Sequence, residues 1–572
     1  MKRIVRINVT DYSIISEDCP PKWESLGGRA LISKIMEDEV DPLCNPLGQF
    51  NKLIIAPGNL AGTTASCVNR LSIGAKSPLT GGIKESNAGG TVALRLARLG
   101  IKALIIEGHP STKELKLIHI AQDGMRFVDA EDFRGMGVYQ CASIIFEKYE
   151  KNPSVTLIGP TGERLQLASG ITNTDVEGVP SRYAGRGGLG AVMGAKQVKA
   201  IVIDDISEAV SLQHDKELFR NTVKAISAIV KESELASNYA KYGTPILVDF
   251  VNSLNALATK NFSTGKFEGA EEINAERMYD LITKRKGEGS TTHACMPGCL
   301  LKCSNIYPDE SGKAIVSPIE FETLALMGSN LLVTDLDAIA KMNYMCNDFG
   351  LDTVETGAAL GVLMEAGVLE FGDAEKAVEL LAQVGEDTYL GRIIAAGAGV
   401  AGKVFGVTRV PVVKNQALPA YDPRAIKGLG VTYATSPMGA DHTAGHTMRS
   451  PVNHLKPDQQ AEVSKKAQIT NTVHDCIGTC FFLGNVLRAH PNGELALLCD
   501  LLQSMTGLEY KDEDLQQIAK DTLTREKQFN INAGLGAASD LLPEFFYFEE
   551  NPATGTVFDV PREEMSTVHD YS

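Results

Sequence analysis

The chain has 572 residues, of which 44% are hydrophobic, so it can bury a sizeable core divided among about two to four domains. Its formal net charge of −16 argues against nucleic acid as the main partner, because phosphate binding needs a basic surface. No run of about 18 apolar residues occurs and the N-terminus lacks a signal core, so we expect no membrane span and a cytoplasmic location.

Residues 1–208 are predicted to form a β-rich N-terminal domain. Short β-branched runs at 52–56, 103–107 and 200–203 alternate there with glycine-rich turns. A short helix is expected over 91–99, where the apolar period is helical and a glycine follows. We find no internal repeat and no low-complexity tract.

A helical period dominates the rest of the chain and predicts two mostly α-helical domains, 209–415 and 416–572. The fold class is therefore multidomain α+β, with a β-rich cofactor-binding domain ahead of two helical domains. The expected helices cover residues 217–234, 275–285, 320–332, 335–349, 374–384, 459–468, 494–504 and 512–530.

Three cysteines lie close together, and a fourth candidate stands far downstream. Cys295, Cys299 and Cys303 are spaced by four residues, and Cys480 follows about 180 residues later. In a reducing compartment such cysteines are free, metal-bound or catalytic rather than paired in disulfides. A short run with a distant partner is a common way to hold an iron–sulfur cluster, because four thiolates are needed and one loop rarely supplies them all.

Two alternatives remain open for these cysteines. Zinc would be satisfied by four thiolates or by three thiolates and a histidine, and His293 and His474 flank the two elements. Cys476 competes with Cys480 as the distant ligand. The remaining cysteines are interpreted as buried and unligated.

A glycine-rich segment over 181–196 is a candidate for cofactor binding. It holds five glycines within ten residues, and such a backbone can lie flat against a planar or anionic ligand. We assign Gly185, Arg186, Gly187 and Gly188 to this role, with the arginine favouring an anion. The alternative is a helix that packs closely on a sheet.

Two further segments, 347–352 and 475–480, share a pattern. Each has a polar residue, two others, a glycine, a small or apolar residue, and then Asp or Cys. Their carboxylate and amide oxygens could accept hydrogen bonds from the N–H groups of a bicyclic pterin. The alternative is a pair of helix C-caps that resemble each other by chance.

Proton transfer is the role expected for a glutamate and a nearby histidine pair. Glu322 follows Pro318-Ile-Glu-Phe, and His442 and His446 lie within five residues of each other in a glycine-rich segment. Two histidines in such a loop favour acid–base chemistry over a purely structural role.

Taken together, these elements resemble the aldehyde:ferredoxin oxidoreductase family of tungsten bis-pterin enzymes. The resemblance runs in the same order over nearly the whole chain, from Gly27-Gly-Arg-Ala30 and Ala56-Pro-Gly58 to Tyr421-Asp-Pro-Arg424 and Gly439-Ala-Asp-His442. It implies oxidation of an aldehyde to a carboxylic acid. Electrons would pass through a [4Fe-4S] cluster to ferredoxin or an iron–sulfur partner subunit, in a homo- or hetero-oligomer.

The resemblance also implies residue roles. Two pterins would hold tungsten (or molybdenum) without a protein ligand, and a Mg²⁺ ion would join their phosphates. Arg70 matches the arginine between cluster and pterin, and Asn87 and Ala184 match the positions that contact Mg²⁺. One pterin-binding turn matches Asn347, Gly350, Leu351 and Asp352, and the other matches Asp475, Gly478 and Thr479. The cluster ligands match Cys295, Cys299, Cys303 and Cys480. The acid–base pair matches Glu322 and His442.

The chain departs from the family pattern at three positions. The gap between the first two cysteines is three residues rather than two, and Asn347 replaces an aspartate. Lys341 stands at the position of an interfacial iron ligand, so no dimer-bridging iron is expected. A related reductase subunit acting on a thioester or aromatic substrate is one alternative function. A non-catalytic zinc-stabilised or electron-carrier protein is another.

Overall fold

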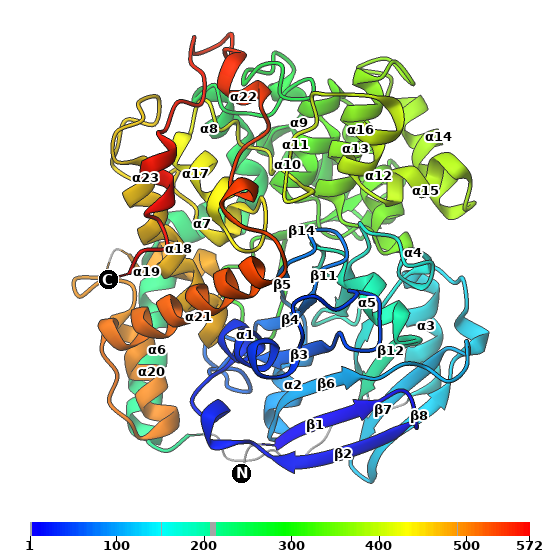
Figure 1. The fold of residues 1–572 in the computed structure, drawn as a ribbon, viewed down its shortest axis with the longest axis vertical. Helices are drawn as coiled ribbons and strands as arrows, with labels where there is room; N and C mark the ends of the chain where they lie inside the picture. The colour runs from blue at the N-terminus through cyan, green and yellow to red at the C-terminus, as the bar shows by residue number, and fades with distance from the viewer. Residues whose placement is uncertain (1–2, 150–151, 206–212, 489, 572) are drawn as a thin grey trace.

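The computed structural model describes residues 3–149, 152–205, 213–488 and 490–571 (Figure 1). The strands of the first 205 residues fill the lower part of that view, and the helices of the later residues lie above and to the left. The predicted fold class, β-rich and then helical, is confirmed. The predicted boundary at 208/209 lies outside the described residues.

The first sheet has six strands in the order β2-β1-β6-β3-β4-β5. Strands β1 and β6 are parallel, whereas every other neighbouring pair is antiparallel. Its strands are β1 (Arg3–Asn8), β2 (Ser13–Asp18), β3 (Leu53–Pro57), β4 (Leu71–Lys76), β5 (Ile83–Ala88) and β6 (Ile101–Glu107).

The second sheet repeats this order. It reads β8-β7-β12-β9-β10-β11, and its one parallel pair, β7 with β12, stands where β1 and β6 stand in the first sheet. Its strands are β7 (Lys116–Ala121), β8 (Gly124–Asp129), β9 (Ser154–Leu157), β10 (Ile171–Thr174), β11 (Pro180–Ala184) and β12 (Val198–Ile203).

The helices complete the repeat. α1 (Gly28–Glu39) and α2 (Val92–Arg98) occupy the same places in the first unit as α3 (Val138–Lys148) and α5 (Leu189–Ala195) in the second. The expectation that the chain has no internal repeat is therefore wrong. The duplication is one of strand order rather than of sequence, because a sheet requires a pattern of apolar residues and not particular side chains.

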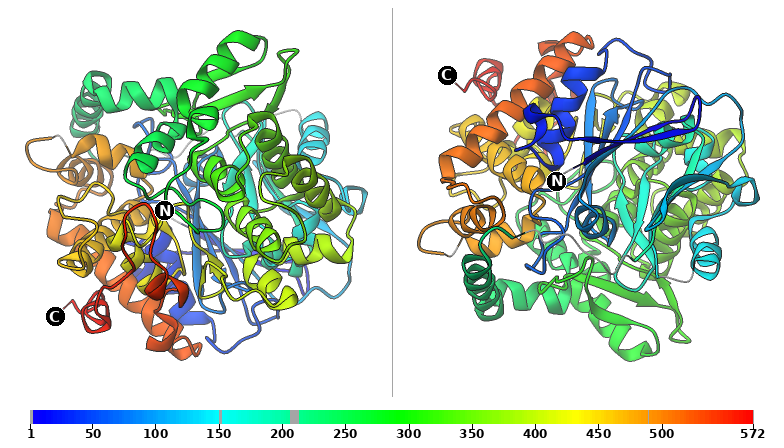
Figure 2. Two further views of the ribbon diagram at one scale, coloured as in Figure 1. Left: turned by 90° about the horizontal axis from the view of Figure 1, so that it is seen from above. Right: turned by 90° about the horizontal axis from the view of Figure 1, so that it is seen from below.

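The two units lie side by side and share one core, as the view from below in Figure 2 shows. Ile7 and Ile106 from the first sheet belong to the same buried cluster as Ile118 and Ile201 from the second. The central strands β3, β6 and β12 are buried almost throughout, while the edge strands β2 and β8 are largely exposed. This explains why the central strands are continuous apolar runs in the sequence.

Most predicted helices are present close to their expected bounds. The 3.6-residue period identified α6 (Lys216–Glu232), α10 (Ala275–Arg285), α12 (Leu336–Phe349), α14 (Ala374–Gly385), α20 (Ala496–Thr506) and α21 (Asp512–Asn532). α18 (Gln460–Ile477) was also identified, but it continues to residue 477, well beyond its expected end at 468. The helix expected over 320–332 is instead two elements, α11 (Phe321–Met327) and the 3₁₀ turn η4 (Ser329–Leu331). The break falls at Gly328, whose φ of −107° and ψ of −93° leave the helical region.

The cysteine run forms a loop between two short strands, although only helices were expected around it. It connects β13 (Ser290–His293) to β14 (Ser304–Pro308), and β15 (Ala314–Val316) completes the small sheet. The predicted boundary at 415/416 falls in the hairpin between β16 (Val412–Val413) and β17 (Gln416–Ala417). One buried cluster contains residues on both sides of it, so this division stays a prediction.

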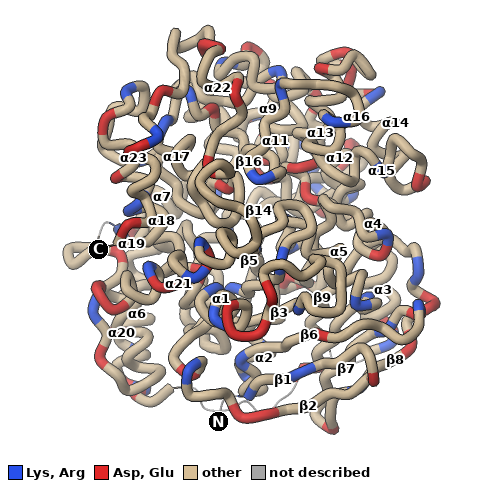
Figure 3. Tube along the Cα trace, in the orientation of Figure 1, with Lys and Arg blue, Asp and Glu red and all other residues tan. Residues whose placement is uncertain are grey.

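Charged residues of both signs are interspersed on the face drawn in Figure 3, and acidic ones outnumber basic ones in the chain. Among the described residues no single helix is long and apolar enough to cross a membrane. One pair of segments, 321–331 and 336–349, passes that test jointly by length and composition, but it is bent by 119°.

Candidate active site

A cavity of about 410 Å³ lies where the ends of β5 and β11 meet the helical part of the chain. Most of the residues assigned to chemistry from the sequence lie on its wall. They are Arg70, Asn87, Gly185, Arg186, Cys295, Cys303, Glu322, Asn347, Leu351, Asp352, His442 and Cys480.

The remaining candidates are not part of the cavity wall. They are Ala184, Gly187, Gly188, Cys299, Gly350, Asp475, Gly478 and Thr479. Some of them shape the backbone behind the wall. Gly188, at φ 73°, is the N-cap of α5, and a Cβ on Gly187 would lie 2.4 Å from Cγ of Lys84. The Asp475 carboxylate pairs with Arg29 at 3.2 Å.

The two similar turns found in the sequence are both helix C-caps. Gly350 caps α12 and Gly478 caps α18, with φ values of 84° and 83°. The Gly350 carbonyl accepts a hydrogen bond from the Gly170 N–H at 2.9 Å, and the Gly478 carbonyl accepts one from the Arg70 N–H at 3.1 Å. Because these donors directly precede β10 and β4, the equivalent strands of the two units, the likeness follows from the repeat and not from chance.

Both turns approach the sheet units too closely for a side chain. A Cβ on Gly58 would lie 2.2 Å from the Gly478 Cα, and a Cβ on Gly159 would lie 2.2 Å from the Phe349 carbonyl oxygen. Only glycine at these two positions lets the turns contact the strands' ends. The close contact places the residues after each turn at the cavity.

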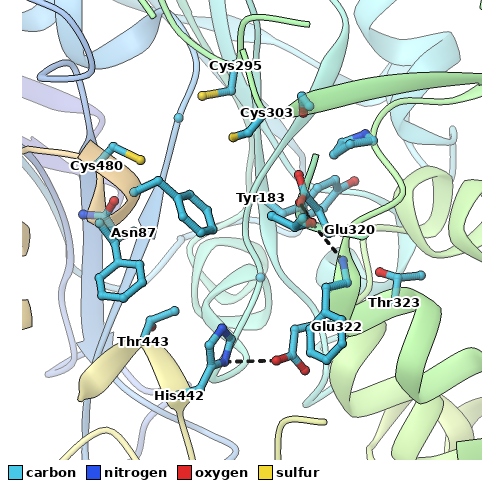
Figure 4. Close-up of a pocket in the computed structure, with 18 of the residues that line it drawn as sticks. Asn87, Tyr183, Cys295, Cys303, Glu320, Glu322, Thr323, His442, Thr443 and Cys480 are labelled. Carbon is cyan, nitrogen blue, oxygen red and sulfur yellow. Dashed lines mark hydrogen bonds and ion pairs between the residues drawn. The ribbon is translucent and has the colours of Figure 1, made fainter. Parts of the chain in front are cut away.

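Three of the four predicted cluster cysteines lie around one part of the cavity. Figure 4 shows the sulfurs of Cys295, Cys303 and Cys480 directed toward a common region. Cys299 does not line the cavity, but its thiol interacts with the Cys295 thiol and its sulfur lies 3.7 Å from the sulfur of Cys67. Cys476 is buried with its sulfur 3.9 Å from the Thr522 hydroxyl, and it does not line the cavity.

Cys67 is a neighbour of the cysteine cluster that sequence reasoning missed. Its backbone has a φ of 60°, and its carbonyl accepts a hydrogen bond from the Cys480 N–H at 2.8 Å. It therefore positions both the run and the distant cysteine. Within the described ranges, no group of three or more His, Cys, Asp or Glu side chains closes on a single point as for one metal ion.

Arginines from both sheet units reach the cavity. Arg70 donates from Nε to the Asn87 side-chain oxygen and from Nη2 to the Asn87 carbonyl, at 3.2 Å in the second case. Arg182 donates from Nη1 to the Ser304 hydroxyl at 2.6 Å. Its Nε and Nη2 are buried and have no hydrogen-bond partner among the described residues, although Asp175 is 3.6 Å from Nη2. No role was assigned to Arg182 from the sequence, although it lies in the glycine-rich segment.

Arg186 joins three segments of the chain. Its guanidinium donates to the Ala440 carbonyl at 2.7 Å and to the Ala417 carbonyl, and it lies 3.4 Å from the Asp352 carboxylate. These contacts occupy much of the side chain that was assigned to anion binding. The structure therefore gives Arg186 a role in holding the cavity wall together.

Glu322 and His442 face each other across the cavity (Figure 4). Glu322 Oε1 is 3.4 Å from His442 Nδ1, although the two groups are not aligned for a hydrogen bond. Glu322 Oε2 accepts a hydrogen bond from the Ala420 N–H at 2.9 Å. Burial raises the pKa of Glu322, and the nearby His442 and Arg186 partly offset that rise.

Further titratable groups surround this pair. The His446 ring is 5.8 Å from the His442 ring, and burial lowers the pKa of His446 well below its ordinary value, so its imidazole is neutral. Burial also raises the pKa of Glu320, whose carboxylate accepts a hydrogen bond from the Thr244 hydroxyl. Both residues lie in segments that the sequence singled out.

Two family models cover the chain. The model described as "Aldehyde ferredoxin oxidoreductase, N-terminal domain" matches residues 4–205, and "Aldehyde ferredoxin oxidoreductase, domains 2 & 3" matches residues 221–570. A tungsten-containing aldehyde ferredoxin oxidoreductase of Thermococcus kodakarensis is 30% identical over 580 residues, which cover 96% of this chain and 92% of the relative. The corresponding protein of Pyrococcus furiosus is also 30% identical, with the same shares covered.

More distant similarities exist. An aliphatic sulfonate oxidoreductase, WOR-like subunit, of Pyrococcus furiosus is 26% identical over 475 residues, covering 75% of this chain and 72% of that protein. Among solved structures, the active site complex BamBC of benzoyl coenzyme A reductase with 1,5-dienoyl-CoA matches with a TM-score of 0.80. It is 20% identical, covers 99% of this chain and 92% of that chain, and supports the fold alone. With both family models matched in order along the chain, this protein belongs to the aldehyde ferredoxin oxidoreductase family of oxidoreductases.

Proposed function

We propose that this protein is a tungsten-pterin enzyme that oxidises aldehydes to carboxylic acids and passes the electrons through a [4Fe-4S] cluster. The observation that carries the proposal is one cavity whose wall includes both the Glu322–His442 pair and the cysteines Cys295, Cys303 and Cys480. Aldehyde oxidation needs a proton acceptor and a route for two electrons in one place. The relatives named as tungsten-containing enzymes support the choice of metal.

The residues around the cavity fit the proposed cofactors. Zinc ligands converge to about 2.3 Å from one ion, whereas the thiolates of a cubane cluster stay several ångströms apart. The cysteines surround a region without closing on a point, which favours a cluster. The buried Arg182 N–H groups without a hydrogen-bond partner offer donors to an anionic cofactor.

When bound, a tungsten–dithiolene centre supplies the two-electron redox chemistry and the cluster supplies one-electron transfer. Cys295, Cys299, Cys303 and Cys480 would hold the cluster, and the thiols of Cys295 and Cys299 are already neighbours. Asn87 and the Ala184 carbonyl would contact Mg²⁺, and the turns at Gly350 and Gly478 would receive the pterins. Arg70, which contacts Asn87, would lie between cluster and pterin.

Glu322 is the proposed proton acceptor. Its Oε2 is held by the Ala420 N–H, so Oε1 is left facing His442 and the cavity. A carboxylate whose pKa is raised by burial is a stronger base than an exposed one and can take a proton from water. His442 would stabilise the charged carboxylate and return the proton to bulk water.

The loop that carries three of the cysteines is the proposed exit for electrons. Gly298, Leu300 and Lys302 in this loop are exposed, and the side chains between them are buried with the cysteines. An acceptor that docks on the loop comes within one layer of side chains of the cluster. Ferredoxin or an iron–sulfur partner subunit is the acceptor that we propose.

The test is an anaerobic assay of the holoenzyme with benzaldehyde and oxidised benzyl viologen. Reduction of the dye with formation of benzoate is the expected result. A holoenzyme that instead oxidises a 1,5-dienoyl-CoA to benzoyl-CoA with the same oxidised dye and ignores aldehydes would establish the reductase alternative. A protein with iron but no activity on either substrate would leave only the electron carrier.

A further inference from the structure

An aromatic wall extends from the acid–base pair along the cavity. The His442 ring lies 5.6 Å from the Tyr421 ring, and Tyr421 lies 5.0 Å from His446. The His446 ring is in turn 5.8 Å from Phe481. All four residues line the cavity, so a substrate whose carbonyl is near His442 meets the faces and edges of aromatic rings that are tilted to one another by 32° to 89°.

The wall continues to a cation. Phe481 lies 5.7 Å from Phe482, whose ring is 4.9 Å from that of Tyr239. Burial raises the pKa of the Tyr239 phenol, and the nearby Arg449 guanidinium partly offsets that rise. Arg449 lines the same cavity, is exposed, and lies near Tyr239, Tyr421 and His446.

Arg449 has an unused positive charge. Its guanidinium lies 6.0 Å over the Phe250 ring, and no carboxylate pairs with it among the described residues. Arg488, the other arginine at this end of the cavity, donates to Glu494 at 2.6 Å and is thereby neutralised. His446 is neutral, and Arg182 on the same cavity wall lies 3.6 Å from the Asp175 carboxylate, so Arg449 is the cation we assign to a substrate anion.

We infer that the substrate is an aldehyde with a flat, preferably aromatic body and a second, anionic group that Arg449 binds. This inference rests on the proposed aldehyde oxidation at Glu322 and His442. A guanidinium offers paired donors that match both oxygens of a carboxylate. Held by Arg449, the anion would fix one end of the substrate while the carbonyl meets the acid–base pair in the same cavity.

The experiment compares 4-formylbenzoate with its neutral methyl ester and with benzaldehyde, using the holoenzyme and benzyl viologen. We expect kcat/KM for 4-formylbenzoate to exceed that for the ester by about tenfold or more, mostly through KM, as for a hydrogen-bonded charge pair. Arg449→Gln should remove this preference. Arg126→Gln should keep it, since Arg126 is an exposed arginine on β8 that pairs with Asp123.

A second measurement separates this inference from the proposed function. Terephthalate and benzoate are titrated by calorimetry into wild-type and Arg449→Gln holoenzyme without any turnover. Tighter binding of terephthalate that depends on Arg449 supports the anion site even if no aldehyde is oxidised, in which case only the proposed function fails. If aldehydes are oxidised but acid and ester are used equally, or if Arg449→Gln slows all three substrates alike, the anion site is overturned and the proposed function stands.

Discussion

The two sheet units share a strand order but present different side chains to the cavity. Each receives a glycine-capped helix end, at Gly478 on the first unit and at Gly350 on the second. Two residues beyond the cap, the turn on the first unit has Cys480 and the turn on the second unit has Asp352. Both residues line the cavity. The scaffold is repeated, whereas the chemistry depends on the few residues that follow each cap.

The difference also extends to what each residue does for its own helix. Asp352 is the N-cap of α13 (Thr353–Glu365), where its Oδ1 accepts a hydrogen bond from the Val354 N–H at 2.9 Å. Cys480 precedes α19 (Phe481–Leu487) at the same place but makes no side-chain cap. Cys480 thus leaves its sulfur available to the cavity, at the cost of a stabilising cap of about 1 kcal/mol.

The largest expected effect comes from removing that sulfur. Cys480→Ser should lower the iron content and abolish dye reduction, because a cluster with three thiolate ligands is held poorly. Cys476→Ser is the matched control, since that sulfur contacts Thr522 and does not line the cavity. Iron analysis and visible absorption measure the outcome. Iron loss in Cys476→Ser but not in Cys480→Ser would reverse the assignment.

A smaller but still large effect is expected at the proton acceptor. Glu322→Gln should lower kcat by about 100-fold or more with metal content unchanged, as for loss of a general base. Glu320→Gln is the comparison variant. The Glu320 carboxylate already accepts a hydrogen bond from Thr244, so its replacement should lower kcat less. Steady-state kinetics on aldehydes decides between them. Full activity in Glu322→Gln would remove that residue from the mechanism.

The pH dependence should report the same group. If Glu322 acts as a base, its ionised form is needed, so kcat should fall as the pH drops through its pKa. Because burial raises that pKa, the fall should begin above the usual carboxyl value of about 4.3. A pH–rate profile of the wild type and of Glu322→Gln tests this. The acidic limb should be absent from the variant, and its persistence there would assign it to another group.

The smallest effect concerns the repeat itself. Gly350→Ala and Gly478→Ala should each destabilise the protein by about 1–2 kcal/mol from the left-handed backbone alone, and by more because the new methyl group meets glycine backbone at 2.8 Å. Gly81→Ala is the control, since Gly81 has a φ of 79° but nothing within 4 Å. Thermal unfolding of the three variants should therefore rank Gly81→Ala as the mildest. Equal costs at all three positions would show that the caps are not closely packed on the units.

Several helices with one polar face were predicted from the sequence, although α3 and α7 (Glu234–Tyr242), which also have exposed residues, were not. α10 was predicted to the residue, because its exposed and buried positions alternate with the helical period. α13 and α17 (Lys427–Thr435) were missed because they are buried on nearly all sides and have no polar face. α11 ends where the Gly328 backbone leaves the helical region, and the spacing of apolar residues does not reveal this break.

The residues of the candidate site that belong to short sequence motifs could be predicted. Glu322 and His442 were assigned from separate motifs, and the structure brings them within 3.4 Å. Arg182 and Arg449 gave no such signal, because their roles depend on which partners they lack in the folded chain. The sheet repeat could not be predicted for a similar reason, since strand pairing depends on the pattern of apolar residues and not on particular residue types.

Elemental analysis of anaerobically purified protein tests the central proposal most directly. We expect about four irons and one tungsten or molybdenum for each chain, as one [4Fe-4S] cluster and one bis-pterin centre require. Zinc alone, with neither iron nor tungsten or molybdenum, would contradict the proposed oxidoreductase.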